Sequence, residues 1–149
     1  MSIDGYHQDD EDRVEEERHA GIVIKDGKLL LIHRIKEGFE YHVFPGGHRR
    51  RDESGEDAVI REIFEETGIT VAEPKLAFDF SDPRNEWIHY YYICTWKNGD
   101  KLYLNGEEKD ADPKVNFFDP MWIDLNEISN LNILPENAKK WVVGKVTNN

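Results

Sequence analysis

The chain has one cysteine, Cys94, in 149 residues, so it can form no internal disulfide and offers no pair of thiolates to a metal ion. It lacks a basic N-terminal segment followed by an apolar one, which argues against a secretory signal. No apolar run approaches the length that spans a membrane. These absences lead us to expect a cytoplasmic protein in which Cys94 is a small buried hydrophobic residue.

Positive charge is also scarce. The 31 aspartates and glutamates outnumber the 19 lysines and arginines, and the formal net charge is −12. Such a balance argues against a nucleic acid polymer or an anionic membrane as the main partner. If the ligand is a small anion, metal ions must bridge it to this acidic protein. The length fits one domain with a substantial core.

The negative charge is concentrated at the N-terminus. Residues 2–17 contain eight acidic side chains and a single arginine, Arg13. A segment this polar buries too little apolar surface to order itself. We therefore predict a flexible acidic tail over residues 1–17, with docking of a metal or partner as the alternative, and one folded domain over residues 18–149.

Alternation of apolar residues and turn signals predicts a strand-rich domain with a few helices. Asp26-Gly27 separates two β-rich runs and is a strong hairpin signal. Pro45-Gly46-Gly47 is typical of a loop. Strands are expected at 19–25, 28–35, 40–44, 69–80 and 87–96, with a short one at 101–104 and another before a helix start at Asp124. A closing helix is expected over residues 135–146. This pattern indicates an α/β domain with helices layered on a sheet.

One helix, over residues 55–67, has clear boundaries. Ser54 is a good N-cap with Asp57 three residues later, and Gly68 lies where a glycine commonly ends a helix. At about 100° per residue, three glutamates fall within an arc of about 100°. We predict that these face away from an apolar side formed by Val59, Ile60, Ile63 and Phe64.

The three glutamates are Glu62, Glu65 and Glu66. Like charges at this spacing destabilise a helix, and more so in a cleft where the dielectric is low. Carboxylate oxygens are the ligands that Mg²⁺ and Mn²⁺ prefer. The alternative is a solvated acidic face, which three glutamates alone would favour in a chain this acidic. The residues around them favour the metal site.

The stretch from Gly47 to Ile69 resembles the Nudix box, G-x5-E-x7-R-E-U-x-E-E-x-G-U, in which U is bulky and aliphatic. Every fixed position is present: Gly47, Glu53, Arg61, Glu62, Ile63, Glu65, Glu66, Gly68 and Ile69. The resemblance to this MutT-like family implies an α/β/α sandwich around a mixed sheet. It also implies a pyrophosphohydrolase that uses Mg²⁺, or Mn²⁺, on a nucleoside diphosphate linked to another moiety.

The same resemblance implies roles within the box. Glu65 and Glu66 are expected as metal ligands, together with the carbonyl of Gly46. Glu62 is expected as a further ligand or as the base that activates water. Arg61 is expected to orient the carboxylates, and Glu53 to brace the loop or help bind metal.

Substrate-binding candidates lie in and around the box. Arg34, Tyr41, Phe44 and Gly47 are expected to contact the substrate, with a surface or core role as the alternative for the first three. In a later loop, Glu107 or Glu108 is a candidate for completing the site. Other aromatic residues that are candidates for stacking on a base, or else core residues, are Phe80, Trp87, Tyr90 and Phe118.

The family resemblance does not select one substrate. A nucleoside triphosphate, ADP-ribose and a nucleotide sugar all remain open, and a homodimer is possible. A second class of function is a non-catalytic module of the same fold that binds a nucleotide as a sensor or scaffold. Modules of that kind usually lose box glutamates, and this chain retains all of them.

Overall fold

The computed structural model describes residues 12–99, 102 and 116–147. Its sheet has the strand order β5-β6-β1-β2-β3-β8, with β4 paired to β1 and β7 paired to β2. The strands are β1 (Glu17–Lys25), β2 (Lys28–Lys36), β3 (Phe39–Val43), β4 (Gly46–Gly47), β5 (Thr70–Ser81), β6 (Ile88–Asn98), β7 (Asn116–Asp124) and β8 (Ile133–Leu134). The helices are α1 (Gly55–Thr67), the 3-10 helix η3 (Leu125–Asn130) and α2 (Glu136–Thr147).

The hairpin between β1 and β2 forms as predicted. Asp26 and Gly27 both have positive φ, 53° and 76°, which fits the tight turn of a two-residue hairpin. Among the described residues, β1 and β2 pair only next to this turn, at Ile24–Leu29 and Lys25–Lys28. Farther along, β1 pairs with β6 and β4, while β2 pairs with β3 and β7. The two strands of the hairpin therefore diverge beyond the turn, and each pairs with different strands of the curled sheet.

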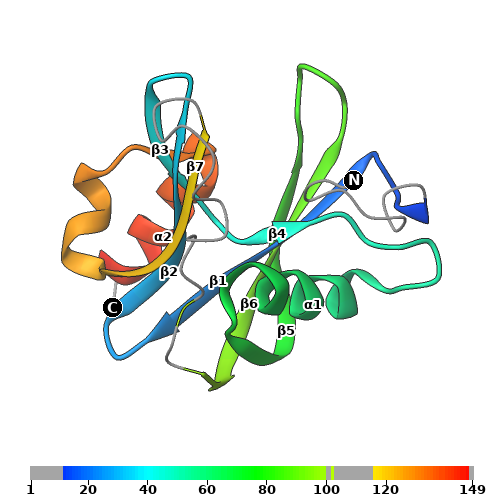
Figure 1. The fold of residues 1–149 in the computed structure, drawn as a ribbon, viewed down its shortest axis with the longest axis horizontal. Helices are drawn as coiled ribbons and strands as arrows, with labels where there is room; N and C mark the ends of the chain where they lie inside the picture. Colours follow the sequence, from blue (N-terminus) through cyan, green and yellow to red (C-terminus); the bar gives the residue numbers. More distant parts are fainter. Residues whose placement is uncertain (1–11, 100–101, 103–115, 148–149) are drawn as a thin grey trace.

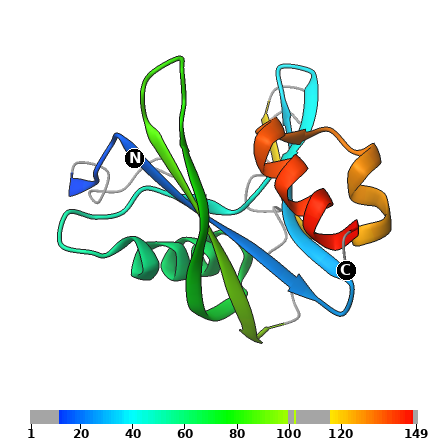
Figure 2. The ribbon, with the colours of Figure 1, turned by 180° about the vertical axis from the view of Figure 1, so that it is seen from behind.

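Helices cover both faces of this sheet, which confirms the expected α/β/α sandwich (Figures 1 and 2). Alternate residues of each strand point to opposite faces. The cluster beneath α1 consists of Val23, Leu30, Val59, Ile63, Ile69, Val71, Tyr92 and Cys94. The cluster beneath α2 and η3 consists of Ala20, Ile22, Leu29, Leu31, Phe44, Tyr91, Ile123, Ile128, Ile133, Ala138 and Val142. Cys94 is buried, as expected.

Helix α1 has the predicted boundaries. The Ser54 hydroxyl accepts a hydrogen bond from the Asp57 N–H at 3.0 Å. Gly68 adopts a left-handed φ of 82°, and its N–H donates to the Phe64 carbonyl. Both ends are therefore fixed by the local capping groups that the sequence contains.

The buried side of α1 differs from the prediction. Ala58, Val59, Ile63 and Thr67 are buried, whereas Phe64 is 47% exposed. At about 100° per residue, the buried residues span an arc that also contains Glu62 and Glu66. The assignment of Phe64 to the packed side was wrong because the helix is rolled toward its carboxylates. This roll presents two glutamates to the sheet.

Other expectations need smaller corrections. Gly46 and Gly47 form the short strand β4 instead of a pure loop, and β8 was not predicted. The closing helix begins at Glu136, one residue after Pro135, and η3 begins one residue after Asp124. The short strand expected at 101–104 lies outside the described residues except for Leu102.

The N-terminal boundary also changes. Val14 N–H donates to the Arg49 carbonyl at 2.8 Å, and Arg51 N–H donates to the Asp12 carbonyl at 3.0 Å. Residues 12–17 therefore belong to the folded domain, and the proposed tail ending at residue 17 was drawn too long. The rest of that tail, residues 1–11, lies outside the described residues. No helix in the described part of the chain is long and apolar enough to cross a membrane.

Candidate active site

Gly46 and Gly47 bring the backbone of β4 against both β1 and the glutamates of α1. The Gly46 N–H donates to Oε1 of Glu66 at 3.0 Å. A Cβ on Gly46 would lie 2.3 Å from the His19 carbonyl oxygen, and one on Gly47 would lie 2.5 Å from Cδ of Glu62. Neither position has room for a side chain. The two glycines thus allow the Glu62 and Glu66 carboxylates to approach the backbone of β4.

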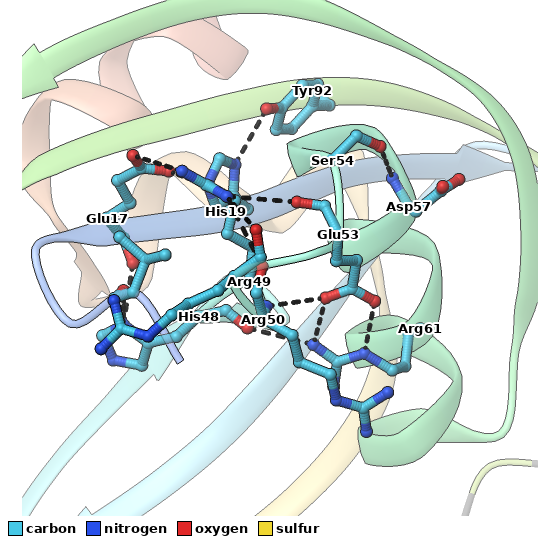
Figure 3. Close-up of polar contacts among 12 residues, drawn as sticks. Glu17, His19, His48, Arg49, Arg50, Glu53, Ser54, Asp57, Arg61 and Tyr92 are labelled. Carbon is cyan, nitrogen blue, oxygen red and sulfur yellow. Dashed lines mark hydrogen bonds and ion pairs between the residues drawn. The ribbon is translucent and has the colours of Figure 1, made fainter. Parts of the chain in front are cut away.

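Arg61 joins most of the acidic groups of the box, and Figure 3 shows its contacts with Glu53. Its Nε donates to Oε2 of Glu53 at 2.8 Å, and Nη2 donates to Oε1 of the same residue at 2.9 Å. Nη1 donates to Glu62 at 3.1 Å and to Glu65 at 3.2 Å. Nη2 also donates to the carbonyl of His48 at 3.1 Å. One guanidinium therefore links the loop before α1 to two of its glutamates.

Glu53 completes the loop that precedes α1. It accepts a hydrogen bond from the Arg50 N–H at 3.0 Å in addition to the two from Arg61. Hydrogen bonding from Arg61 holds the pKa of Glu53 below its ordinary value. This arrangement supports the bracing role among the two expected for Glu53, because its oxygens face the loop and Arg61.

The three glutamates of α1 lie in different environments. Burial raises the pKa of Glu66 to about 8, with Glu62 adding to the rise and Arg18 and Arg34 opposing it. Burial also raises the pKa of Glu62, which Arg61 opposes. Glu65 is the exposed member, with 47% of its side chain accessible. Two carboxyl groups are thus held at high energy in their charged form, a state that a bound cation relieves.

The expected metal ligands are the carboxylates of Glu62, Glu65 and Glu66 and the carbonyl of Gly46. Oxygen donors of these kinds suit a hard divalent cation. Within the described residues, no three histidine, cysteine, aspartate or glutamate side chains converge closely enough to hold a metal as they stand. Arg61 instead occupies the space shared by Glu62 and Glu65. Arg61 donates to one oxygen of each carboxylate, so the second oxygen of each can bind a cation while the Arg61 contact remains.

Three of the residues proposed as substrate contacts lie side by side on β2, β3 and β7. Arg34 on β2 is the register partner of Tyr41 on β3 and of Phe118 on β7. The Arg34 guanidinium carbon lies 5.5 Å from the centre of the Phe118 ring. Arg34 also lowers the pKa of Glu66, so this row of three residues lies near the carboxylates of α1. It combines a cation with two aromatic rings.

Phe44 is a core residue instead of a substrate contact. It is 1% exposed, and its ring meets Tyr91 edge-on at 5.5 Å. Its position before Pro45 points the ring into the cluster beneath α2, so the core alternative applies. The remaining aromatic candidates contact histidines: Phe80 stacks on His89, Tyr90 stacks on His19, and Trp87 lies edge-on to His48. Glu107 and Glu108 lie outside the described residues.

A buried polar network beside the box loop was not predicted from the sequence. His19 shares hydrogen bonds with the Tyr92 hydroxyl and with Glu17, both at 2.9 Å. Arg49 donates to Glu17 at 2.7 Å and to the Glu53 carbonyl at 3.3 Å (Figure 3). Burial lowers the pKa of His19. The network ties β1 and β6 to the loop, and no motif in the sequence marks it.

Arg18 was missed as well. Its Nη2 donates to the Phe44 carbonyl at 3.0 Å and its Nη1 to the Gly46 carbonyl at 3.3 Å. The sequence shows only an arginine at the start of a predicted strand. Its contacts depend on the pairing of β4 with β1, which brings Gly46 opposite Ala20.

Comparison with known proteins identifies the family. A model described as the NUDIX domain matches residues 15–143. An uncharacterized Nudix hydrolase, YvcI, of Bacillus subtilis is 32% identical over 117 residues, which cover 74% of this chain and 66% of the relative. An ADP-ribose pyrophosphatase of Methanocaldococcus jannaschii is 36% identical over 104 residues, which cover 66% of this chain and 59% of the relative. The match thus spans less than two thirds of either relative's length.

Solved structures share the fold. A structure from work on MutT of Aliivibrio salmonicida and Vibrio cholerae superposes with a TM-score of 0.63 at 23% identity. The alignment covers 86% of this chain and 95% of that one. At this identity the likeness concerns architecture alone, and the family follows from the domain match together with the intact box. The chain belongs to the NUDIX domain family.

Proposed function

We propose that this protein hydrolyses the pyrophosphate bond of a nucleoside diphosphate linked to another moiety, with Mg²⁺ or Mn²⁺ as cofactor. The observation that carries the proposal is the roll of α1, which turns Glu62 and Glu66 toward Gly46 and Gly47. An acidic helix face with no such role faces solvent, where its charges are hydrated. Here two of the three carboxylates are instead partly removed from water.

The proposed metal ligands are the carboxylates of Glu62, Glu65 and Glu66 and the carbonyl of Gly46. When bound, a divalent cation neutralises the diphosphate and lowers the pKa of a coordinated water. Arg61 holds Glu62 and Glu65 in place before the cation arrives. Glu53 in turn fixes Arg61, so the positions of the carboxylates depend on the loop.

Glu62 is our candidate for the group that takes the proton from the attacking water. A general base works best when its pKa lies near the working pH, and burial moves that of Glu62 upward. The high pKa of Glu66 has the same cause, but its carboxylate is engaged by the Gly46 N–H. Glu62 binds the metal, takes the proton from water, or does both. The conservative substitution Glu62→Gln distinguishes these roles.

The substrate is a small nucleotide. The net charge of −12 disfavours a nucleic acid polymer. One relative is named an ADP-ribose pyrophosphatase, and ADP-ribose therefore joins nucleoside triphosphates and nucleotide sugars as candidates. We propose that Arg34 and Tyr41 contact the substrate, because their row places a cation beside aromatic rings near Glu66.

The test is release of phosphate or pyrophosphate from a panel of nucleoside triphosphates, ADP-ribose, dinucleoside polyphosphates and nucleotide sugars, with and without Mg²⁺. We expect turnover that needs the metal and that falls by at least about 10²-fold in Glu65→Gln and in Glu66→Gln. Thermal unfolding of each variant checks that the fold is intact. Saturable nucleotide binding without turnover on the whole panel would instead support the sensor or scaffold function.

A further inference from the structure

Arg18 donates a hydrogen bond to the proposed backbone ligand, the carbonyl of Gly46. It is half-buried at the start of β1, and its two terminal nitrogens donate to the carbonyls of Gly46 and Phe44. The peptide nitrogen of Gly46 donates to Glu66. Gly46 is thus held from two directions, by a carboxylate at its N–H and by a guanidinium at its carbonyl.

Arg18 and Arg34 lie on different strands, and the charge of each lowers the pKa of the same carboxyl group, that of Glu66. Both favour the ionised form of Glu66, and Arg18 does the same for Glu62. The first belongs to β1 and the second to β2, which separate after the hairpin. An anion approaching the glutamates meets positive charge on both strands.

The contact between Arg18 and Gly46 conflicts with metal binding unless an anion is added. A carbonyl oxygen has two lone pairs and can accept from Arg18 while binding a cation. However, the guanidinium and the cation then repel each other at short range. A phosphate group that contacts both positive charges removes this repulsion, and a planar guanidinium matches phosphate oxygens well.

We propose that Arg18 is a substrate-binding residue that holds the diphosphate of the nucleotide next to the Gly46 carbonyl. The proposal rests on the proposed function, since it names a further residue for the same substrate. In it, Arg18 exchanges a carbonyl contact for charge-assisted hydrogen bonds to phosphate oxygens. The competing role is structural: Arg18 only pins the Phe44–Gly46 segment, and the substrate never touches it.

Calorimetric binding of imidodiphosphate, a pyrophosphate analogue that resists hydrolysis, separates these roles. The titration is made with Mg²⁺ present, and Mg²⁺ affinity is measured separately without the analogue. A charge-assisted hydrogen bond contributes about 1.5–3 kcal/mol, so Arg18→Ala is expected to weaken analogue binding by about 10- to 100-fold. Mg²⁺ affinity measured without the analogue should not fall, because the substitution removes the repulsion between the guanidinium and the cation. Arg18→Lys should recover part of the loss, since it keeps the charge but not the planar fork.

Arg84→Ala is the matched control. It removes the same charge from a side chain that is 86% exposed and bonded to Asp82. Analogue binding by this variant should equal that of wild type. Unchanged analogue affinity in Arg18→Ala, or equal losses of Mg²⁺ and analogue affinity, would overturn the proposal. A wild-type protein that binds the analogue but hydrolyses no nucleotide contradicts the proposed reaction, while its titration still decides the role of Arg18.

Discussion

Arg61 and Glu53 form a two-point ion pair, with Nε–Oε2 and Nη2–Oε1 distances of 2.8 and 2.9 Å. Both side chains are largely buried, at 19% and 13% exposure. The same guanidinium holds Glu62 and Glu65. Arg61 therefore connects the loop before α1 with the carboxylates of that helix. A substitution of Glu53 in the loop should for this reason affect the proposed metal site.

Glu53→Gln tests this connection. The amide removes the charge and cannot accept from both nitrogens of Arg61, so we expect a loss of about 1.5–3 kcal/mol in the free energy of unfolding. Mg²⁺ affinity should also fall, although Glu53 does not need to touch the metal. Denaturant unfolding and calorimetric Mg²⁺ titration measure the two effects. Glu127→Gln, on the exposed surface of η3, is the control and should change neither.

Gly47→Ala tests the close approach of β4 to α1. The added methyl would lie 2.5 Å from Cδ of Glu62, so the carboxylate must move. We predict weaker Mg²⁺ binding and a kcat reduced by at least about tenfold. Gly144→Ala is the opposite case, because nothing lies within 4 Å of its added methyl on α2. It should stabilise the protein by about 0.5–1 kcal/mol with unchanged turnover. Equal effects at both glycines would rule out the steric explanation.

Ile63→Ala and Phe64→Ala compare neighbouring positions on α1. Ile63 is fully buried, so its truncation should lower the free energy of unfolding by about 2–5 kcal/mol. Phe64 is 47% exposed, and its truncation should cost less than about 1 kcal/mol. Thermal or denaturant unfolding gives both values. Similar losses would restore the sequence-based assignment of Phe64 to the packed side.

His42 should contribute to the pH dependence of stability. Burial lowers its pKa, and its stacked neighbour His33 acts in the same direction, while Glu40 opposes them. The unfolded chain therefore binds a proton at a higher pH than the folded one, so stability falls as pH decreases below about 6.5. We expect His42→Phe to show a smaller loss of unfolding free energy between about pH 7 and pH 5. An identical slope in both proteins would contradict this assignment.

Local rules were sufficient for several elements. The turn at Asp26-Gly27 and the caps at Ser54 and Gly68 each depend on a few adjacent residues, and all three formed as expected. The acidic residues of the Nudix box also lie in one region, as the resemblance implied. These features need no knowledge of what packs against them.

Contacts between distant segments account for the rest. The roll of α1 depends on the sheet beneath it, so periodicity alone placed Phe64 on the wrong side. Strands as short as β4 and β8 exist only through their partners. Phe44 and Arg18 have roles set by the pairing of β4 with β1, at a separation of more than 25 residues. Their residue types give no indication of it.

The most direct test of the account is the rate of pyrophosphate-bond cleavage in the preferred nucleotide as Mg²⁺ is titrated. Wild type, Glu66→Gln and Glu127→Gln should be compared at equal folded fraction. We predict a saturable Mg²⁺ dependence in wild type and in Glu127→Gln, and a rate at least about 10²-fold lower in Glu66→Gln at every Mg²⁺ concentration. Full activity without a divalent cation, or a Glu66→Gln rate equal to wild type, would contradict it.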